Sequence, residues 1–535
     1  MIVHCVPTHI LNNLNFSTDS IQDKLTKIKV NKSPGPDKIH PRLLYEMANE
    51  IAQFLSRFFQ LSYDNGVLPS DWKTSVVTVI HKKGKKDLVE NYRPISLTSI
   101  PCKIMESIIR DYLMDYFLKN KFFNMGQYGF IKGRSTAIQL LKIMDDWTEC
   151  IDNGLQVDII YTDFEKAFDK VPHIRLINKL KAYGVLDAVI RWVEAFLTGR
   201  TQKIAINGTM SSTHPVLSGI PQGSVLGPLL FIIFINDLPD MCNQLSSMYL
   251  FADDAKIYKI IHSDSDSMLL NESYLNMIKW CDTWCMKLNL DKCKVLSITK
   301  NMNAIKKYQY GNSNIGILDH IDVIKDLGVN IDTTIGFKTQ IYEKINKAYQ
   351  MLGIINRNFY ELDTKSFLMI YKSMVRSHLE YAAQVWCPFK QGLIEDMEKV
   401  QKRATKMIKG LSKMSYRERL IHINLPTLRY RRLRGDMIEV FKILNGFYDE
   451  NIAPKLIRNL DGRTRGNSEK LIHRQSNTDI RKFSFCVRVV GVWNSLPNSV
   501  IQSTSINNFK NNLDNHWKNE EIYYNWEVNL SALNS

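Results

Sequence analysis

Apolar residues recur along the first part of the chain in patterns that predict helices and strands. Three- and four-residue steps predict helices over 41–66, 104–117 and 135–151. Shorter runs predict strands at 75–80 and 157–163. The second run, VDIIYTD, is a short apolar stretch that ends in an acid, as expected of a strand buried on both faces. The apolar stripe of the first helix is formed by Leu43, Leu44, Met47, Ile51, Phe54 and Phe58.

The middle of the chain is richer in strand-like runs. KIAIN followed by Gly208 predicts a hairpin, and MYLFADDAKIYKI predicts two short strands joined through Ala252, Asp253 and Asp254. KVLSITK and DLGVNID, at 294–300 and 326–332, predict further strands. From about 337 to 410 the pattern is helical. The order therefore favours a mixed α and β protein with a helical second half.

The longest apolar run is VLGPLLFIIFI at 225–235. Its eleven residues fall short of the ~20 that a bilayer span needs, so it predicts a buried core element. The amino terminus lacks a basic segment followed by an apolar one, which argues against a secretory signal. We expect a soluble intracellular protein of the nucleus or cytoplasm, not secreted and not bound to a membrane.

Composition supports a large folded core. With 535 residues, 44% hydrophobic and 23% charged, the chain is long enough for three or four domains, and global disorder is excluded. The nine cysteines include no CxxC pair, which argues against a disulfide scaffold and a zinc ribbon. Cys281 and Cys285 have the closest spacing; buried free thiols and a metal site are the two interpretations.

The formal net charge of +16 indicates a polyanionic partner, with nucleic acid first and an anionic membrane second. The excess is concentrated at 399–435, where twelve Lys and Arg accompany one acid, Glu418. A basic stripe on one helix face suits a duplex backbone, and the RYRRLR run at 429–434 adds to it; a solvated face without a partner is the alternative. The stripe consists of Lys399, Lys402, Arg403 and Lys406.

Three acids occupy positions that solubility does not explain. Asp163 closes an apolar strand, and Asp253 and Asp254 are adjacent between two apolar strands. Adjacent carboxylates repel each other and are stabilised by cations, and hard oxygen ligands favour Mg²⁺, with Mn²⁺ as a substitute. Two Mg²⁺ ions could activate a 3′-hydroxyl and stabilise a leaving pyrophosphate. An ordinary polar turn is the alternative for the adjacent pair.

A second aspartate pair is a different case. Asp145 and Asp146 lie in a helical pattern with Leu140, Leu141 and Met144. We therefore expect both acids on the exposed edge of a helix, outside any converging site.

Eight short blocks follow one another between about 32 and 332: SPGPDKI, NYRPISL, YGFIKGRST, YTDFEKAFDKVPH, SGIPQGSVLGPLLF, FADD, LNLDKCKVL and KDLGV. Their order resembles the reverse transcriptases of non-LTR (LINE-type) retrotransposons, in the Jockey-like branch. The tail is similar at RSHLEYAAQVW, EDMEKVQKRAT and RVVGVWNSLPNSV. FADD begins with Phe251, where many reverse transcriptases have Tyr; the change removes a hydroxyl and no ligand.

The resemblance implies an α+β right-hand polymerase with fingers, a palm with an antiparallel sheet and a helical thumb, followed by a mainly helical basic C-terminal region. In these terms 1–30 is a lead-in, 31–336 holds fingers and palm, 337–430 is the thumb, and 431–535 is the basic module. About thirty residues precede SPGPD, so we expect the endonuclease activity from a missing segment or another protein.

Catalytic roles follow from the matching blocks. By resemblance, Asp163 and Asp253 bind the metal pair, Asp254 is the adjoining acid, and Lys292 protonates pyrophosphate. Arg93 holds the triphosphate, with Lys82 or Lys83 as the second cation. The remaining matches are Phe168 as the aromatic gate beneath the sugar, Gln222 and Gly223 beside the incoming nucleotide, and Gly328 at the primer terminus.

The implied activity is RNA-directed DNA synthesis from dNTPs on an RNA template and DNA primer, with the RNA–DNA duplex against the Lys399 face. Three alternatives stay open. An intron-encoded maturase is one, and an RNA-dependent RNA polymerase is another, although Phe168 argues against a ribonucleotide substrate. The third is an inactive or domesticated copy that only binds nucleic acid.

Overall fold

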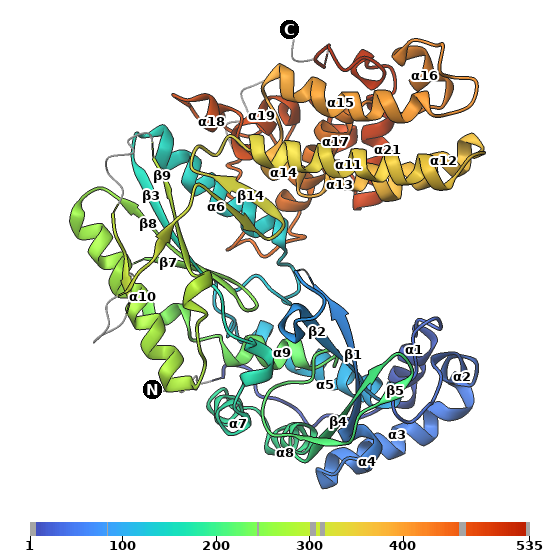
Figure 1. The fold of residues 1–535 in the computed structure, drawn as a ribbon, viewed down its shortest axis with the longest axis vertical. Helices are drawn as coiled ribbons and strands as arrows, with labels where there is room; N and C mark the ends of the chain where they lie inside the picture. Colours follow the sequence, from blue (N-terminus) through green and yellow to red (C-terminus); the bar gives the residue numbers. More distant parts are fainter. Residues whose placement is uncertain are drawn as a thin grey trace. The chain divides into compact units, whose positions relative to one another are not determined.

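The computed structural model describes residues 7–82, 84–242, 246–299, 306–310, 316–459 and 467–530 (Figure 1). The chain forms two units, each built from three segments. Unit 1 comprises Met1–Ile131, Thr162–Ile257 and Leu270–Cys293. Unit 2 comprises Lys132–Tyr161, Tyr258–Leu269 and Lys294–Ser535.

Unit 1 contains a five-stranded sheet in which the order is β2-β1-β4-β5 and β6 also pairs with β4 (Figure 1). β1 is antiparallel to β2 and parallel to β4, with Ile80 opposite Arg93 in the first pair. The predicted strand at 75–80 and the predicted hairpin near Gly208 are both confirmed. The strands are β1 (Thr74–His81), β2 (Tyr92–Leu97), β4 (Arg200–Ile206), β5 (Thr209–Met210) and β6 (His214–Val216).

Unit 1 also contains helices. The predicted helix at 104–117 is confirmed as α5 (Ile100–Lys119), and the apolar run at 225–235 is confirmed as a core element, since it forms the buried helix α9 (Gly227–Phe234). The others are α1 (Thr18–Thr26), α2 (Pro41–Glu46), α3 (Ala48–Asn65), α4 (Ser70–Lys73), α7 (His173–Ala182), α8 (Asp187–Leu197) and most of α10 (Asp264–Trp284).

The predicted helix at 41–66 is divided into α2 and α3 at Met47. Several residues of its apolar stripe, including Leu43 and Phe54, are exposed. The buried side of α3 instead consists of three small residues, Tyr63 and Phe59, whose ring meets those of Phe16 and Trp72 edge-on. Small residues let the neighbouring α1 approach closely, which periodicity does not reveal.

A second sheet has the order β12-β9-β3-β8-β7. All seven residues of β3 are buried, which confirms the predicted two-sided burial. β3 is antiparallel to β9, and β12 is parallel to β9. The bounds are β3 (Gln156–Thr162), β7 (Ser247–Phe251), β8 (Asp254–Ile261), β9 (Lys294–Ile298) and β12 (Asp319–His320). β7 and β8 are the two strands predicted on either side of the Asp253 turn.

DLGVNID was predicted as one strand, and this is wrong. It contributes to a hairpin of β13 (Val323–Asp326) and β14 (Val329–Asp332), with the turn at Leu327 and Gly328. Both turn residues have positive φ, +45° and +85°, and Gly adopts such a conformation without strain. A short β10–β11 pair, Gln309–Tyr310 with Gly316–Ile317, also belongs to unit 2.

Unit 2 is otherwise helical. α6 (Thr136–Asp152) confirms the predicted helix at 135–151, and the helical stretch at 337–410 is confirmed as a series of helices. The boundary expected at 430/431 falls inside α17, and the domain limits stay a prediction. The series is α11 (Lys338–Asn358), α12 (Thr364–Ile370), a π-helical segment (Tyr371–Arg376), α13 (Ser377–Glu380), α14 (Ala383–Trp386), α15 (Gln391–Lys406), α16 (Tyr416–His422), α17 (Leu428–Leu444), α18 (Asp479–Lys482), α19 (Phe485–Ser495), α20 (Asn498–Ile501) and α21 (Ile506–His516).

The expectation that Asp145 and Asp146 lie on an exposed helix edge is wrong. Asp145 is 6% exposed and forms ion pairs with Arg481 at 2.7 Å and Arg474 at 3.3 Å. Asp146 pairs with Lys142 and accepts a hydrogen bond from Tyr258 at 3.0 Å. The arginine partners lie more than 300 residues further along the chain, where a local pattern cannot indicate them.

The RYRRLR run is likewise internal to unit 2, which corrects its assignment to a duplex-binding surface. Arg431 forms two hydrogen bonds to Glu380, and Arg434 forms two to Asp514. Arg429 donates to the carbonyl oxygen of Trp526 at 2.9 Å, and Arg432 is buried. The guanidinium groups of Arg429, Arg431 and Arg434 thus connect α17 to other parts of unit 2.

The described cysteines are free thiols and most are buried. In the closest pair Cys281 is buried, as expected of a core thiol, whereas Cys285 is exposed; Cys5 lies outside the described residues. Within the described part of the chain, no helix is both long and apolar enough to cross a membrane.

Candidate active site

Asp163 and Asp253 belong to unit 1 and lie at the ends of neighbouring strands. Asp163 directly follows β3, and Asp253 lies in the turn between β7 and β8. The hydroxyl of Thr162 donates to the carbonyl oxygen of Ala255 at 3.1 Å, which ties the end of β3 to the start of β8. This pairing brings acids that are far apart in the sequence to the same edge of the sheet.

The turn that carries Asp253 is held by Gln127. Ala252 has φ +57°, which is uncommon for a residue other than Gly. The buried side chain of Gln127 accepts hydrogen bonds from the backbone N–H groups of Ala252 at 3.0 Å and Gly129 at 2.8 Å. A Cβ on Gly129 would come within 2.5 Å of the Ala252 nitrogen, so only Gly allows this approach. Gln127 adjoins the YGFIKGRST block but was not identified from the sequence.

Three predicted site residues interact electrostatically with Asp253. Burial raises the pKa of the Asp253 carboxyl, and the charge of Asp163 raises it further. The positive charges of Arg93 and Lys82 act in the opposite direction on the same pKa. Arg93 is on β2, and Lys82 follows β1, where its backbone N–H donates to Asn91 at 2.7 Å. Arg93 and Lys82, at the paired strands β1 and β2, therefore both act to lower the pKa of Asp253 in the turn between β7 and β8.

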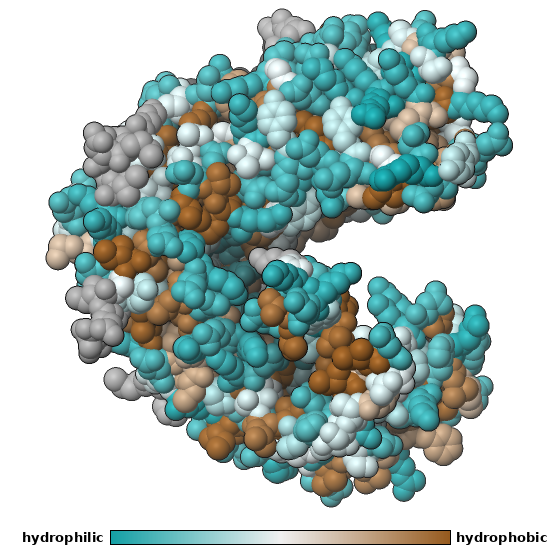
Figure 2. All heavy atoms as spheres, viewed as in Figure 1, coloured by the Kyte–Doolittle hydropathy of each residue, from teal (hydrophilic) through white to brown (hydrophobic). Residues whose placement is uncertain are grey.

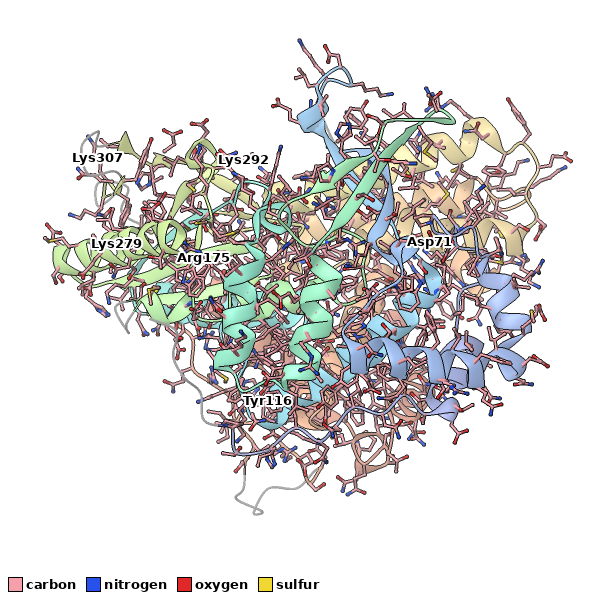
Figure 3. The ribbon with its side chains drawn as sticks, turned by 90° about the horizontal axis from the view of Figure 1, so that it is seen from below. Asp71, Tyr116, Arg175, Lys279, Lys292 and Lys307 are labelled. Carbon is pink, nitrogen blue, oxygen red and sulfur yellow. The ribbon has the colours of Figure 1, made fainter. Side chains whose placement is uncertain are left out.

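Asp163 is paired with Lys292. The Nζ atom of Lys292 lies 2.9 Å from Oδ2 of Asp163, and the Lys292 side chain, labelled in Figure 3, is 62% exposed. Backbone hydrogen bonds hold the two segments together, because Asn289 donates to the carbonyl oxygen of Asp163 at 2.8 Å. Lys292 closes a single turn of 3-10 helix, Leu290–Lys292.

The two carboxylates fit a divalent cation. Mg²⁺ is commonly bound by one or two carboxylates, with water and substrate phosphates as the other ligands. The repulsion that raises the pKa of Asp253 is what a cation between the pair would relieve. Asp254 is exposed at the start of β8, and its metal role stays a prediction. Among the residues that the structure describes, no group of three or more His, Cys, Asp or Glu side chains could hold a metal ion by itself.

Phe168 is half-buried and rests on an aromatic partner. Its ring stacks on that of Phe231 in α9, with centroids 4.3 Å apart and an interplanar angle of 20°. The carbonyl oxygen of Phe168 accepts a hydrogen bond from Ile220 at 2.8 Å. Phe231 was predicted only as part of a buried run, so its contact with Phe168 was missed.

Gln222 and Gly223 lie in a loop fixed by its backbone. Ser96 of β2 donates to the carbonyl oxygen of Gln222 at 2.7 Å, and the Gln222 side chain donates to Asp169 at 2.9 Å. Gly223 has φ +117°, and a Cβ there would come within 2.6 Å of the Ser96 oxygen. The loop therefore requires Gly at this position.

The other predicted residues belong to unit 2 or are not described. Gly328 lies in the β13–β14 turn, where Tyr381 donates to the carbonyl oxygen of the preceding Leu327 at 2.8 Å. The predicted basic stripe lies on α15. In the view of Figure 2, hydrophilic side chains cover most of the surface of α11, α12 and α15. Lys83 lies outside the described residues, so the question whether Lys82 or Lys83 is the second cation for the triphosphate stays open.

The predicted stripe on α15 is partly engaged within unit 2. Lys399 pairs with Asp396 at 3.0 Å, Lys402 lies over the Trp526 ring at 4.6 Å, and Arg403 lies over the Tyr349 ring at 5.5 Å. Lys399, Arg403 and Lys406 remain exposed, and binding of this face to a duplex stays a prediction.

The chain is similar to known reverse transcriptases. Residues 80–354, just over half of the chain, match the family model described as reverse transcriptase (RNA-dependent DNA polymerase). The RNA-directed DNA polymerase from mobile element jockey of Drosophila melanogaster is 27% identical over 73% of this chain and 44% of its own length. The probable RNA-directed DNA polymerase from transposon BS of the same fly is 26% identical over the same shares.

A more distant relative is the Pol polyprotein from the type-2 retrotransposable element R2DM of Drosophila melanogaster, 23% identical over 62% of this chain and 31% of its own length. The chain therefore spans less than half the length of these relatives. The family match extends from β1 through most of α11 and includes every predicted catalytic and nucleotide-binding residue. The chain belongs to the reverse transcriptase (RNA-dependent DNA polymerase) family.

Proposed function

We propose that this chain is the polymerase region of a Jockey-like non-LTR retrotransposon protein. It extends a DNA primer with dNTPs along an RNA template. The observation that carries the proposal is the meeting of Asp163 and Asp253 with the cations of Arg93 and Lys82. Two acids beside two cations match a reaction in which a triphosphate is held and its α-phosphate is transferred.

In the reaction, the primer 3′ oxygen forms a bond to the α-phosphorus, and the bond from that phosphorus to the bridging oxygen of pyrophosphate breaks. Asp163 and Asp253, with Asp254 adjoining, would hold two Mg²⁺ ions, which make the 3′-hydroxyl easier to deprotonate and neutralise charge on the leaving group. Arg93 offers a planar fork for phosphate oxygens, and Lys82 or Lys83 adds a point charge.

Lys292 would return a proton to pyrophosphate. Its ammonium group lies 2.9 Å from Asp163 and is accessible, so it is close to where the leaving group must be. General acid catalysis of this kind typically contributes ~10²- to 10⁴-fold to the rate.

Phe168 would select the sugar. Its ring is supported from one side by Phe231, so it cannot easily retreat from a 2′-hydroxyl. Gln222 and Gly223 would line the nucleotide on the loop tied to β2. A supported ring favours deoxynucleotides and argues against an RNA-dependent RNA polymerase.

The right-hand architecture is the arrangement that this function implies. Fingers would come from the N-terminal part of the chain, with the palm around Asp163 and Asp253. The helices from α11 onward would form the thumb and the C-terminal module, with α15 against the RNA–DNA duplex and Gly328 near the primer terminus. Endonuclease activity is expected from a further segment or another protein.

The test is primer extension on a defined RNA template, with purified protein, a DNA primer, dNTPs and Mg²⁺. We expect template-directed extension that stops when the metal is chelated and resumes when it is restored. Extension only with rNTPs would favour an RNA polymerase. Template binding without any extension would favour the inactive, nucleic-acid-binding copy.

A further inference from the structure

A buried acid of unit 1 lies outside the set of predicted site residues. Glu106 is on α5 and is fully buried. Its Oε2 atom accepts hydrogen bonds from the backbone N–H groups of Val225 at 2.7 Å and Leu226 at 3.0 Å. A buried carboxyl group is costly, and Oε1 of Glu106 has no hydrogen-bond partner among the described residues. The two N–H groups on Oε2 and the positive charges of Arg200 and Lys103 are therefore what offset its burial.

The two N–H groups lie at the beginning of α9. The first N–H groups of a helix have no partner inside it, and the positive end of the helix dipole favours an acid there. Ser224 accepts from Gly227 at 3.0 Å, and Glu106 supplies the acceptor for the two preceding residues. The start of α9 is thus fixed by a side chain from another helix.

Helix α9 in turn carries Phe231, whose ring supports Phe168. The loop before α9 is bonded to Phe168 through Ile220 and to β2 through Gln222. Glu106 fixes the end of this loop that joins α9, through Val225 and Leu226. The nucleotide loop and the ring beneath the sugar therefore share one anchor.

We propose that Glu106 is a positioning residue for sugar selection: by fixing the start of α9 it holds Phe231, and through it Phe168, against the 2′ position of the nucleotide. The inference rests on the proposed function, and it adds a residue that does not touch the substrate. A merely structural Glu106 would affect stability but not the preference for deoxynucleotides.

The experiment compares kcat/KM for a dNTP and the matching rNTP in the wild type, Glu106→Ala and Glu106→Gln. Glu106→Ala should lower the dNTP/rNTP ratio about three- to tenfold, the range expected when one aromatic stack is lost. The KM for the dNTP should rise more than kcat falls. Glu106→Gln keeps an oxygen that accepts both N–H groups and should restore most of the ratio.

Tyr116→Phe provides the matched control on the same helix (Figure 3). The Tyr116 hydroxyl donates to the carbonyl oxygen of Tyr183 at 2.7 Å, so this variant also loses a buried hydrogen bond but leaves α9 capped. It should lower the melting temperature and leave the ratio unchanged. An equal change of ratio in Tyr116→Phe and Glu106→Ala would overturn the inference.

Phe231→Leu tests the part of the link between Phe231 and Phe168, whether or not Glu106→Ala folds. It should lower the ratio while the start of α9 stays capped. Where Glu106→Ala folds, adding Phe231→Leu to it should lower the ratio little further. Unchanged ratios in active variants would overturn the role of Glu106 and leave the proposed function standing. A wild type without RNA-templated extension would overturn both.

Discussion

Lys292 and Asp163 form an ion pair, with Nζ and Oδ2 2.9 Å apart, although 129 residues separate them in the sequence. The same carboxylate is the proposed ligand of a divalent cation. The ammonium group therefore balances a charge that a metal would otherwise balance. In the proposed reaction, Lys292 would both compete with the cation for Asp163 and donate a proton to the product.

Lys292→Ala separates these two roles. Loss of the competing ammonium group should lower the Mg²⁺ concentration at half-maximal activity two- to fivefold, since a partly exposed ion pair contributes roughly 0.2–1 kcal/mol. Loss of the Lys292 ammonium group as the proton donor should lower kcat by ~10²-fold or more. Lys287→Ala is the control, because Lys287 pairs with Glu165 at 3.3 Å on the same segment. Identical Mg²⁺ curves and kcat in both variants would exclude the assigned roles.

Phe168→Val should widen the space beneath the sugar. We expect ribonucleotide incorporation to rise about 10- to 100-fold relative to the wild type, since a buried steric contact of this size contributes roughly 1–3 kcal/mol. Competing dNTP and rNTP substrates measure the ratio. Phe58→Ala, which removes an exposed ring of α3, should not change it. An unaltered preference in Phe168→Val would remove the gate assignment.

If the exposed basic stripe of α15 binds the RNA–DNA duplex, the affinity for the duplex should depend on salt concentration through these residues. Replacing Lys399, Arg403 and Lys406 by Gln should weaken binding of an RNA–DNA duplex and reduce the slope of log affinity against log salt by roughly 1 for each phosphate that is no longer neutralised. Fluorescence anisotropy at several salt concentrations measures the slope. An unchanged slope would indicate that the duplex does not meet this face.

The arginine run of α17 should behave differently. Arg434→Gln breaks the pair with Asp514, so it should lower the free energy of unfolding, with no effect on the salt slope. Denaturant unfolding and the same anisotropy assay distinguish the two. A reduced slope with unchanged stability would restore this run to the nucleic-acid interface.

Lys179 predicts an unusual pH dependence of stability. Its ammonium group lies 3.6 Å from the ring centroid of Trp284, donates to Asp237 at 2.6 Å and is almost fully buried. Burial lowers the pKa of Lys179 to about 8, against the attraction of Asp237 and Asp240. Between pH 8 and the ordinary Lys pKa near 10.4, the unfolded chain keeps a proton that the folded chain has lost.

The unfolding free energy therefore rises with pH across that window, by up to about 3 kcal/mol from this group. In Lys179→Met this contribution is absent. Urea unfolding of both proteins at pH 7.5 and pH 10 should show the wild type gaining stability relative to the variant. If the unfolding free energies of the wild type and Lys179→Met differ by the same amount at both pH values, the assigned pKa of Lys179 is contradicted.

Local pattern predicted much of the fold and the elements that carry the candidate site. The apolar run of β3 and the acids of the β7–β8 turn were recognisable because burial and alternation are local properties. Catalytic assignments needed more than local pattern, since they came from the order of blocks. The structure adds the strand pairing that brings Asp163 to Asp253.

Long-range partners could not be predicted. Asp145 was expected at the surface because its helix pattern was clear, whereas its burial depends on Arg481. The RYRRLR run was assigned to nucleic acid because the acids that neutralise it, such as Glu380 and Asp514, lie elsewhere in the chain. The role of Gln127 could not be recognised in the sequence, because holding the turn at Ala252 requires only one amide oxygen in the correct place.

The central claim is that Asp163 and Asp253 act together on one nucleotide, and single-turnover incorporation on an RNA template tests it most directly. Asp163→Asn, Asp253→Asn and the double variant should each lose at least ~10³-fold in rate, and the double variant should lose little more than either single one. Asp264→Asn, an exposed acid, should keep the wild-type rate. Incorporation at the wild-type rate by a folded Asp253→Asn protein would contradict the account.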